Sequence, residues 1–346
     1  MPITEDIRSQ AEKIVVNAGK GRLVDMVPIF YGGNNRAWRL ETNKEPLFLK
    51  QYFRSDKDRR DRFGTELSFL SYTWSLGVRC IPQPLAANRA DLIALFVFID
   101  GKRISQEQVD RCAIDRALHF IKQVNTDNTT LKAQCLAPAS ESCFSIAAHI
   151  ESVEKRCNRL LSIEGIDTIT RSAQRFIKNE LHTRWCRIKK NILHAVSQKR
   201  IYPNQLISRD EMILSPSDFG FHNALLSNQG TFYFIDFEYA GWDDPAKLVC
   251  DFFSQPEIPV PIRFFKPFIG TLSKSIGTGH HGMKQLLWRA SLLFPLYRLK
   301  WCCIMLNDFI SVSRKRKDFA SFGIDKRKVQ LEKASIYIKD IDHGIR

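Results

Sequence analysis

The stretch Asp218-Phe-Gly-Phe-His-Asn223, followed by Phe-Ile-Asp236-Phe-Glu238, decides the fold of this 346-residue chain. Asp218 precedes Asn223 by five residues, and Asp236 ends an apolar, strand-like run at 231–235. Phosphoryl transfer from a nucleotide needs a carboxylate that accepts the proton of the attacking hydroxyl. It also needs amide and carboxylate oxygens that hold metal ions. The two Asp side chains and the Asn amide therefore predict a phosphotransfer site.

Each piece of this stretch also has an ordinary structural explanation. A single Asp is most often a turn or cap residue, and an Asp five residues before an Asn is a weak signal when it stands alone. The strand that ends in Ile-Asp and the turn-like segment at 241–245 supply the structural context that a motif needs. The combination carries the prediction, and no single residue does.

This stretch resembles the aminoglycoside phosphotransferase and choline kinase superfamily, the small-molecule relatives of protein kinases. Those enzymes usually carry His-Gly-Asp before the motif Asn, and the sequence Ile-Asp-Phe-Glu-Tyr-Ala-Gly at 235–241 is similar to the choline kinase version. The resemblance implies an α+β, two-lobed protein-kinase-like fold. It places a small β-rich nucleotide-binding lobe at residues 1–100 and a larger, mainly helical lobe with the catalytic and substrate-binding parts at 101–346.

A glycine-containing turn lies upstream, in the N-terminal part of the chain. The sequence from 28 to 40 is typical of a strand, a turn and a second strand, with Gly32, Gly33 and Asn35 at the turn. Glycines let backbone N–H groups come close to phosphate oxygens, so these residues are candidates for nucleotide binding. The alternative is an ordinary hairpin turn.

A lysine and a glutamate follow in the order that kinases use. Lys50 lies in a strand candidate at 46–52, and Glu66 lies in a helix candidate at 59–75 with apolar residues at helical spacing. In kinases a strand lysine contacts the nucleotide phosphates, and a helix glutamate pairs with that lysine. Taken singly, Lys50 is as well explained by an exposed strand lysine and Glu66 by a solvated helix carboxylate.

The apolar run at 92–99, closed by Asp100 and Gly101, resembles the strand and hinge that join the two lobes of a kinase. In the family the adenine edge bonds to the hinge backbone. The resemblance therefore implies nucleotide contacts near Phe96 and Phe98. The alternative is a buried strand that ends in a turn.

The resemblance assigns a role to each motif residue. It implies that Asp218 is the catalytic base, and that Asn223 and Asp236 bind Mg²⁺ on the phosphates of ATP or GTP. Lys50 would hold the phosphates and Glu66 would position Lys50. Most of the rate enhancement would then come from positioning and charge neutralisation.

Four residues close to the motif also bear on the site. The family's His-Gly is replaced here by Pro216-Ser217, which puts the geometry of the loop in question without removing a charge that touches phosphate. His222 is either a loop-stabilising residue or a substrate contact. Glu238 lies two residues after Asp236, and strand residues two apart share a face. It is therefore expected to support the metal site, the alternative being a strand-end carboxylate.

The acceptor molecule is expected to face a C-terminal helix candidate at 293–309, which Pro295 kinks or starts. Tyr297, Lys300 and Trp301 recur near helical spacing and are candidates for substrate contacts. The alternative is a core helix whose basic side chains reach toward solvent.

Two further side chains bear on the identity of the acceptor. If the polar stripe of this helix faces the site, Arg298 and Lys300 disfavour a polycation and favour a neutral sugar or an anionic acceptor. Trp242, after the metal strand, is either a flat surface on which a sugar stacks or a packing residue.

The composition is that of a globular protein with reduced cysteines. The chain is 44% hydrophobic and 26% charged, and no apolar run reaches the roughly 18–20 residues needed to span a bilayer. Nine cysteines are scattered without a C-x-x-C pair, which argues against a disulfide framework or a zinc site. We therefore expect a cytoplasmic protein without a membrane segment.

The net charge of +15 raises the question of nucleic acid. Basic clusters lie at 54–62, 184–190 and 314–317. No helix-turn-helix, zinc finger or stacking motif accompanies them, so nucleic acid is not the expected partner. A basic surface also steers anionic nucleotides toward a site.

These observations predict a nucleotide-dependent phosphotransferase that moves the γ-phosphate of ATP or GTP to a hydroxyl of a small molecule. The acceptor would be a sugar, an aminoglycoside-like compound or a choline-like amino alcohol. One alternative is a protein-directed kinase of the same fold, although the chain lacks the protein-kinase His-Arg-Asp, Asp-Phe-Gly and Ala-Pro-Glu set. Another is a non-catalytic pseudokinase that binds nucleotide or nucleic acid.

Overall fold

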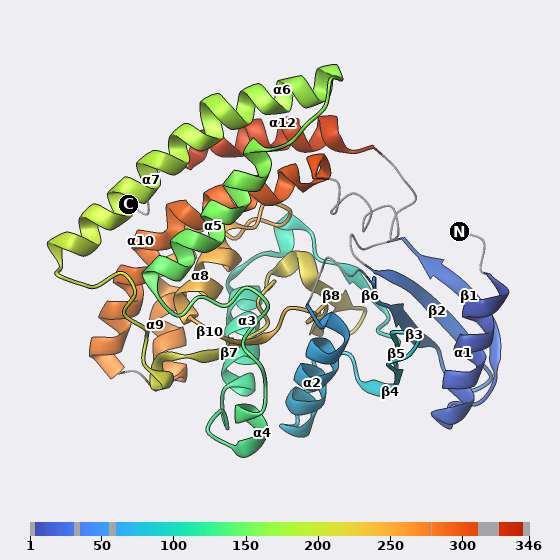
Figure 1. Ribbon diagram of the computed structural model, residues 1–346. Coiled ribbons are helices and arrows are strands. Elements are labelled where there is room, and N and C mark those ends of the chain that lie inside the picture. The colour runs from blue at the N-terminus through green and yellow to red at the C-terminus, as the bar shows by residue number, and fades with distance from the viewer. Residues whose placement is uncertain (1–3, 31–34, 55–59, 278, 311–324, 342–346) are drawn as a thin grey trace. The chain divides into compact units, whose positions relative to one another are not determined.

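The computed structural model describes residues 4–30, 35–54, 60–277, 279–310 and 325–341 (Figure 1). Its contacts divide the chain into two compact units. Unit 1 takes the described residues up to Arg103 together with Asn223–Glu238. Unit 2 takes Ile104–His222, Tyr239–Ser311 and the residues from Asp325 onward, as far as they are described. The segment Asn223–Glu238, far along the sequence, thus belongs with the N-terminal part.

Unit 1 is built on an antiparallel five-stranded sheet with the order β1-β2-β3-β5-β4. Its strands are β1 (Leu23–Ile29), β2 (Arg36–Thr42), β3 (Leu47–Gln51), β4 (Pro84–Asn88) and β5 (Ile93–Val97). Alternate side chains of the strands point to one face, where they form a single core with the buried face of α1 (Glu5–Asn17). Figure 1 shows α1 packed along the sheet. The other helix of this region is α2 (Arg62–Ser75).

Capping residues in the sequence set where these two helices begin. The Thr4 side chain accepts the backbone N–H of Ile7 at the start of α1, and the Asp61 side chain accepts that of Gly64 at the start of α2. The helix expected at 59–75 is therefore confirmed over Arg62–Ser75.

A smaller sheet completes unit 1, with the order β6-β8-β9. It joins β6 (Gly101–Arg103) to the hairpin of β8 (Ala224–Ser227) and β9 (Phe232–Phe234). The strand expected at 231–235 is thus shorter than predicted. Asp236 follows it with φ of 67°, in the left-handed region. The expectation that Asp236 and Glu238 share a strand face is therefore wrong, because neither residue lies in a strand.

Unit 2 is mainly helical, and its long helix α10 packs against α5, α7, α8 and α9 (Figure 1). The helices are α3 (Arg111–Val124), α4 (Leu131–Gln134), α5 (Ile146–Leu161), α6 (Thr168–Phe176), α7 (His182–Gln198), α8 (Pro245–Ser254), α9 (Phe265–Ser275), α10 (Gly279–Met305) and α12 (Arg327–Tyr337). A π-helical segment, Ile177–Leu181, joins α6 to α7. Short 3-10 turns occupy Gln106–Gln108, Arg209–Glu211, Phe221–Asn223, Ile262–Phe264, Leu306–Phe309 and Ile338–Asp340.

Two findings in unit 2 refine the expectations from sequence. Pro295 lies inside α10, which begins at Gly279, so this proline does not start the helix. Within the described part of the chain, no helix is both long enough and apolar enough to cross a bilayer. The α+β fold class expected from the sequence is confirmed.

A buried asparagine ties the strand before Asp218 to the helical part of unit 2. Strand β7 (Ile213–Ser215) pairs with β10 (Gly241–Asp243). The Asn125 side chain, at the end of α3, accepts the Leu214 N–H at 2.8 Å and donates to the Leu214 carbonyl at 3.0 Å. It also donates to the Ile121 carbonyl at 2.9 Å. One amide therefore satisfies both backbone groups of Leu214 in a buried environment.

Replacing Asn125 by Ala should destabilise the protein by about 2–3 kcal/mol, because it leaves the Leu214 N–H and C=O buried without these partners. Urea unfolding followed by circular dichroism measures the change. Asn158→Ala, at an exposed position of α5, is the matched control and should shift stability by less than about 0.5 kcal/mol. Equal effects of the two substitutions would contradict the role given to Asn125.

Candidate active site

A buried lysine organises the charged groups of unit 1. Lys50, near the end of β3, is 7% exposed. Its Nζ lies 2.6 Å from Glu66 Oε2 and 2.7 Å from Asp236 Oδ1. The Tyr52 hydroxyl donates to Glu66 Oε2 at 2.7 Å, and the Phe237 N–H donates to Glu66 Oε1 at 3.2 Å. Glu66 is thereby fixed from three sides, and Lys50 links the helix α2 to the segment after β9.

Three acidic residues lie close enough to Lys50 to raise its pKa: Asp236, Glu66 and Glu238. Burial alone would lower the pKa of Lys50, but Asp236, Glu66 and Glu238 more than offset this, and its pKa lies well above the usual value. Burial together with Glu238 and Glu66 raises the pKa of Asp236 to about 7, against the lowering effect of Lys50. A further positive charge would relieve this crowding of acids.

Asp236 is the member of the cluster that is open to solvent. Its side chain is 34% exposed, whereas that of Glu66 is 4% exposed and Glu238 is fully buried. The Ile235 N–H donates to the Asn223 carbonyl at 3.0 Å, and Ala224 pairs with Phe234 in the hairpin. Asn223 and Asp236 therefore flank the same end of the β8–β9 hairpin. Carboxylate and amide oxygens of this kind suit Mg²⁺.

Asn35 connects the start of β2 to two other parts of unit 1. Its Nδ2 donates to Glu238 Oε2 at 2.5 Å, and its Oδ1 accepts the Phe53 N–H at 3.2 Å. Both ends of the Asn35 amide are thus used within the protein, and Glu238 is held next to the cluster. Its contact with nucleotide stays a prediction. Gly32, Gly33 and the basic cluster at 314–317 lie outside the described residues.

The expected hinge region is the end of β5. Phe96 is 1% exposed and pairs with Phe48 and Pro84 on the neighbouring strands. The Phe98 N–H donates to the Pro46 carbonyl at 3.4 Å, and the Arg39 guanidinium lies 4.7 Å from the centre of the Phe98 ring. The nucleotide contacts of Phe96 and Phe98 stay predictions.

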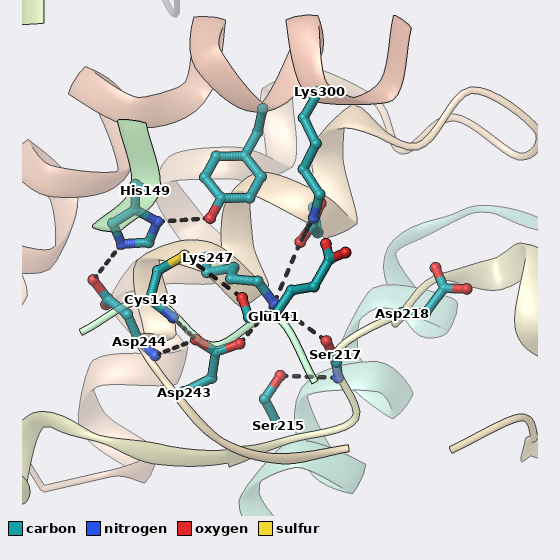
Figure 2. Close-up of polar contacts among 12 residues, drawn as sticks. Glu141, Cys143, His149, Ser215, Ser217, Asp218, Asp243, Asp244, Lys247 and Lys300 are labelled. Atoms are coloured by element: carbon teal, nitrogen blue, oxygen red, sulfur yellow. Dashed lines mark hydrogen bonds and ion pairs between the residues drawn. The ribbon is translucent and has the colours of Figure 1, made fainter. Parts of the chain in front are cut away.

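In unit 2, Asp218 lies in the loop after β7 with a side chain that is 33% exposed. His222 Nε2 is 3.2 Å from Asp218 Oδ1. Ser217, directly before Asp218, has φ of 68°, which is uncommon for a residue with a side chain. Figure 2 shows Asp218 beside the polar contacts that fix Ser217 and Ser215. The carboxylate is therefore accessible, while the backbone that carries it is held.

Two aromatic candidates for the acceptor site lie inside unit 2. Trp242 is 3% exposed, its Nε1 donates to the Ala133 carbonyl at 3.0 Å, and the Arg209 guanidinium lies 3.8 Å from its ring centre. Tyr297 is 1% exposed, and its hydroxyl lies 2.6 Å from His149 Nδ1. These contacts give both rings a packing role in unit 2.

The two remaining candidates on α10 both contact Asp251. Lys300 Nζ donates to each carboxylate oxygen of Asp251 at 2.9 Å, and Trp301 Nε1 donates to Asp251 Oδ1 at 3.0 Å. The Trp301 ring also lies edge-on to His222, with ring centres 5.9 Å apart. Of the two, Trp301 is the one in contact with the partner of Asp218.

A buried histidine network was not predicted from the sequence. His149 on α5 lies between the Tyr297 hydroxyl and Asp244, with Nε2 3.2 Å from Asp244 Oδ2 (Figure 2). Asp244 also pairs with Arg289 at 2.8 Å. Burial alone would lower the pKa of His149, but Cys143 and Asp244 raise it to about 9. Burial alone would raise the pKa of Asp244, but Arg289 and His149 lower it to about 2.

The sequence does contain a signal for part of this network. Asp243, Lys247 and Asp251 are spaced by four residues; Lys247 and Asp251 lie on one side of α8, and Asp243 ends β10 just before this helix. Asp244 precedes a proline, and its side chain caps α8 by accepting the Ala246 N–H at 2.7 Å. From the sequence, the segment 241–245 is predicted only as a turn. An acid, a base and an acid at four-residue spacing in an otherwise apolar segment are the signal in the sequence that indicates a buried ionic cluster.

Known proteins are similar to this chain in structure and not detectably in sequence. No family model and no curated protein matches the sequence. A choline kinase from Cryptosporidium parvum Iowa II superposes with a TM-score of 0.60 at 12% identity, over 99% of this chain and 97% of that one. A spectinomycin phosphotransferase in complex with ADP and spectinomycin gives 0.56 at 14%, over 97% and 99%. The Plasmodium vivax ethanolamine kinase gives 0.58 at 12%, over 98% and 86%.

These identities are low, so the similarity concerns the fold. The fold is the one found in choline and ethanolamine kinases and in aminoglycoside phosphotransferases, as the sequence motifs predicted. The kinase-like architecture inferred from the motif residues is thereby confirmed.

The His149–Asp244 pair predicts how stability depends on pH. A histidine whose pKa is about 9 in the folded protein and near 6.5 when unfolded stabilises the fold fully below pH 6.5. This contribution is lost as pH rises through 9. We expect the free energy of unfolding to fall by about 1–3 kcal/mol between pH 6.5 and 9.5 through this residue.

Urea unfolding at several pH values tests this expectation. His149→Gln cannot be charged, so the variant should lack this part of the decrease. His119→Gln, at an exposed position of α3, should keep the wild-type pH dependence. If His149→Gln shows the same slope as wild type, the charged pair does not exist.

Proposed function

We propose that this protein is a phosphotransferase that moves the γ-phosphate of ATP or GTP to a hydroxyl of a small molecule. The observation that carries the proposal is the buried contact of Lys50 with Glu66 and Asp236 in unit 1. A strand lysine, a helix glutamate and a carboxylate that follows a motif Asn are the groups that phosphoryl transfer in this kind of fold requires. The similarity to solved kinase structures supports the same function.

The donor set in unit 1 fits a nucleotide with its metal ion. Lys50 is a cation that could contact the phosphates, and Asn223 with Asp236 supplies oxygen ligands for Mg²⁺. Glu238 and Glu66 raise the pKa of Asp236, and a divalent cation bound at Asp236 would reduce this repulsion. When bound, Mg²⁺ would neutralise charge on the phosphates. Glu238, buried and held by Asn35, would add negative charge close to these ligands.

Asp218 is proposed as the group that handles the proton. Its carboxylate would accept the proton of the acceptor hydroxyl while the hydroxyl oxygen bonds to the γ-phosphorus and the nucleoside diphosphate leaves. His222 lies next to Asp218 and would hold the carboxylate in orientation through the contact at 3.2 Å. The resulting protonated Asp218 returns its proton to water after release of product.

The charges on α10 give no support to an anionic acceptor. Lys300 is 6% exposed and bonded to Asp251, and Arg298 donates to the Asp340 carbonyl at 2.6 Å. Both cations are therefore used within unit 2. The solved structures of similar fold are named for choline, ethanolamine and spectinomycin, so these compounds and neutral sugars form the first acceptor panel.

The cysteines fit a reducing compartment. All nine cysteines are free, as expected for a protein of the cytoplasm. We therefore propose a cytoplasmic location and a small-molecule partner, with nucleic acid as the alternative raised by the net charge.

The test is release of ADP or GDP from the Mg-nucleotide in the presence of the acceptor panel and of a metabolite extract. Asp218→Asn should lower acceptor-dependent turnover by about 10²–10⁴-fold, because the proton acceptor is lost. Nucleotide binding should persist, since the groups proposed to hold phosphate are in unit 1. Asp210→Asn, at an exposed position, is the control and should keep wild-type turnover.

The remaining outcomes separate the alternatives. Turnover that no small molecule stimulates, together with Asp218-dependent labelling of a protein, would show a protein-directed kinase. Nucleotide binding without any turnover would show a pseudokinase. Retention of full acceptor-dependent turnover in Asp218→Asn would contradict the role of Asp218.

A further inference from the structure

The backbone just before Asp218 is held in an unfavourable conformation. Ser217 has φ of 68°, and the Asp218 N–H donates to the Pro216 carbonyl at 3.0 Å. This hydrogen bond spans three residues and makes a γ-turn whose central residue has positive φ, a strained type. A residue with a Cβ in such a region costs on the order of 1–3 kcal/mol and persists only when its surroundings impose it.

The hydrogen bonds of Ser217 show what imposes the turn. Its N–H donates to Ser215 Oγ at 3.0 Å, and its own Oγ accepts from Lys247 Nζ at 3.2 Å (Figure 2). Ser217 is 8% exposed and Lys247 is 2% exposed. A charged donor in a buried site binds its acceptor more strongly than a neutral one.

Lys247 itself is fixed by two carboxylates, Asp243 at the end of β10 and Asp251 one turn further along α8. Its Nζ lies 2.6 Å from Asp243 Oδ2 and 3.8 Å from Asp251 Oδ2. Burial alone would lower the pKa of Lys247, but Asp243 and Asp251 raise it above its usual value, so the group is charged at neutral pH. Asp243 also accepts the backbone N–H groups of Cys143 and Asp244 at 3.0 and 2.9 Å. The ammonium therefore has a set position from which it reaches Ser217.

A second series of contacts connects Asp251 to the side chain of Asp218. Asp251 accepts from Trp301 Nε1, the Trp301 ring meets His222 edge-on, and His222 Nε2 contacts Asp218 Oδ1. The close approach of the His222 ring requires a glycine at position 220, where a Cβ would lie 2.7 Å from His222 Nδ1.

From these contacts we infer that Lys247 is a positioning residue for Asp218, acting through the Ser217 hydroxyl on the turn that carries the candidate base. The inference rests on the proposed function for its kinetic consequence, since it explains how a loop with Pro216-Ser217 holds its geometry. We call the contact between Lys247 Nζ and Ser217 Oγ the Lys247 brace.

If the Lys247 brace supports a strained turn, replacement of Ser217 by Gly should be less harmful than replacement by Ala. Ser217→Ala removes the hydroxyl but keeps the Cβ at positive φ, so the turn loses its support and keeps its strain. Ser217→Gly also removes the hydroxyl, but glycine adopts this φ without penalty. Ser217→Gly should therefore retain more turnover than Ser217→Ala, which a purely space-filling role of the serine does not predict.

The test measures kcat, nucleotide KM and backbone hydrogen exchange in residues 213–222 of the full chain. Ser217→Ala and Lys247→Met should each lower kcat about tenfold or more, since small displacements of a reacting group are costly. Nucleotide KM should stay within about twofold, because the groups proposed to hold phosphate lie in unit 1. The double variant should lose no more kcat than Lys247→Met alone, since both changes remove the same contact. Exchange in this segment should accelerate in each variant.

Ser254→Ala is the matched control, because Ser254 is a serine of α8 that is 1% exposed. It should leave kcat and exchange at the wild-type values. The inference is overturned if Ser217→Ala behaves like Ser254→Ala, or if Ser217→Gly loses as much turnover as Ser217→Ala. It is also overturned if the kcat losses of Ser217→Ala and Lys247→Met multiply when both substitutions are combined. If Lys247→Met does not fold, the Ala and Gly variants of Ser217 decide. If wild type transfers no phosphate, the proposed function fails, and hydrogen exchange alone still decides whether the brace holds the turn.

Discussion

The placement of Lys50 between Glu66 and Asp236 in unit 1 is the constraint on which the proposed chemistry depends. Lys50 is buried, and its ammonium lies within 2.7 Å of both carboxylates. Removal of one partner of a buried ion pair typically costs about 3–5 kcal/mol, because the other charge is left without compensation. Burial of these charged groups therefore costs stability, and Asp236, whose side chain is partly exposed, can contact a bound cation.

Unit 2 contains a second buried ionic cluster, in which Lys247 and Lys300 pair with Asp243 and Asp251. All four side chains are nearly inaccessible to solvent. A buried cluster suits support of the backbone, whereas a partly exposed carboxylate such as Asp236 suits binding of a charged ligand.

Much of the fold could be predicted from the sequence, since Lys50, Glu66, Asp218, Asn223 and Asp236 occur in a characteristic order. The order also predicted which groups meet in unit 1, because a strand lysine and a helix glutamate have a known relation in this kind of fold. The supporting network around Lys247 and His149 could not be predicted in the same way. It joins residues far apart in the chain, such as His149 with Tyr297, and only tertiary packing brings them together.

The same limit explains the errors in detail. Asp236 and Glu238 follow an apolar run, and the period-two pattern of a strand was extended to them. The left-handed backbone at Asp236 ends that pattern, and a single non-glycine residue gives little sign of such a conformation. Lys300 is a second example, because its position on a helix does not reveal that its ammonium pairs with the Asp251 carboxylate.

The most direct test of the central claim is calorimetric titration of wild type and Asp236→Asn with ADP, with and without Mg²⁺. The account predicts that wild type binds ADP more tightly when Mg²⁺ is present, and that Asp236→Asn loses about tenfold or more of this metal-dependent gain, because a carboxylate ligand is replaced by a neutral amide. Binding that is independent of Mg²⁺ and equal in both proteins would contradict the claim that Asp236, beside Lys50, serves to hold a metal-bound nucleotide.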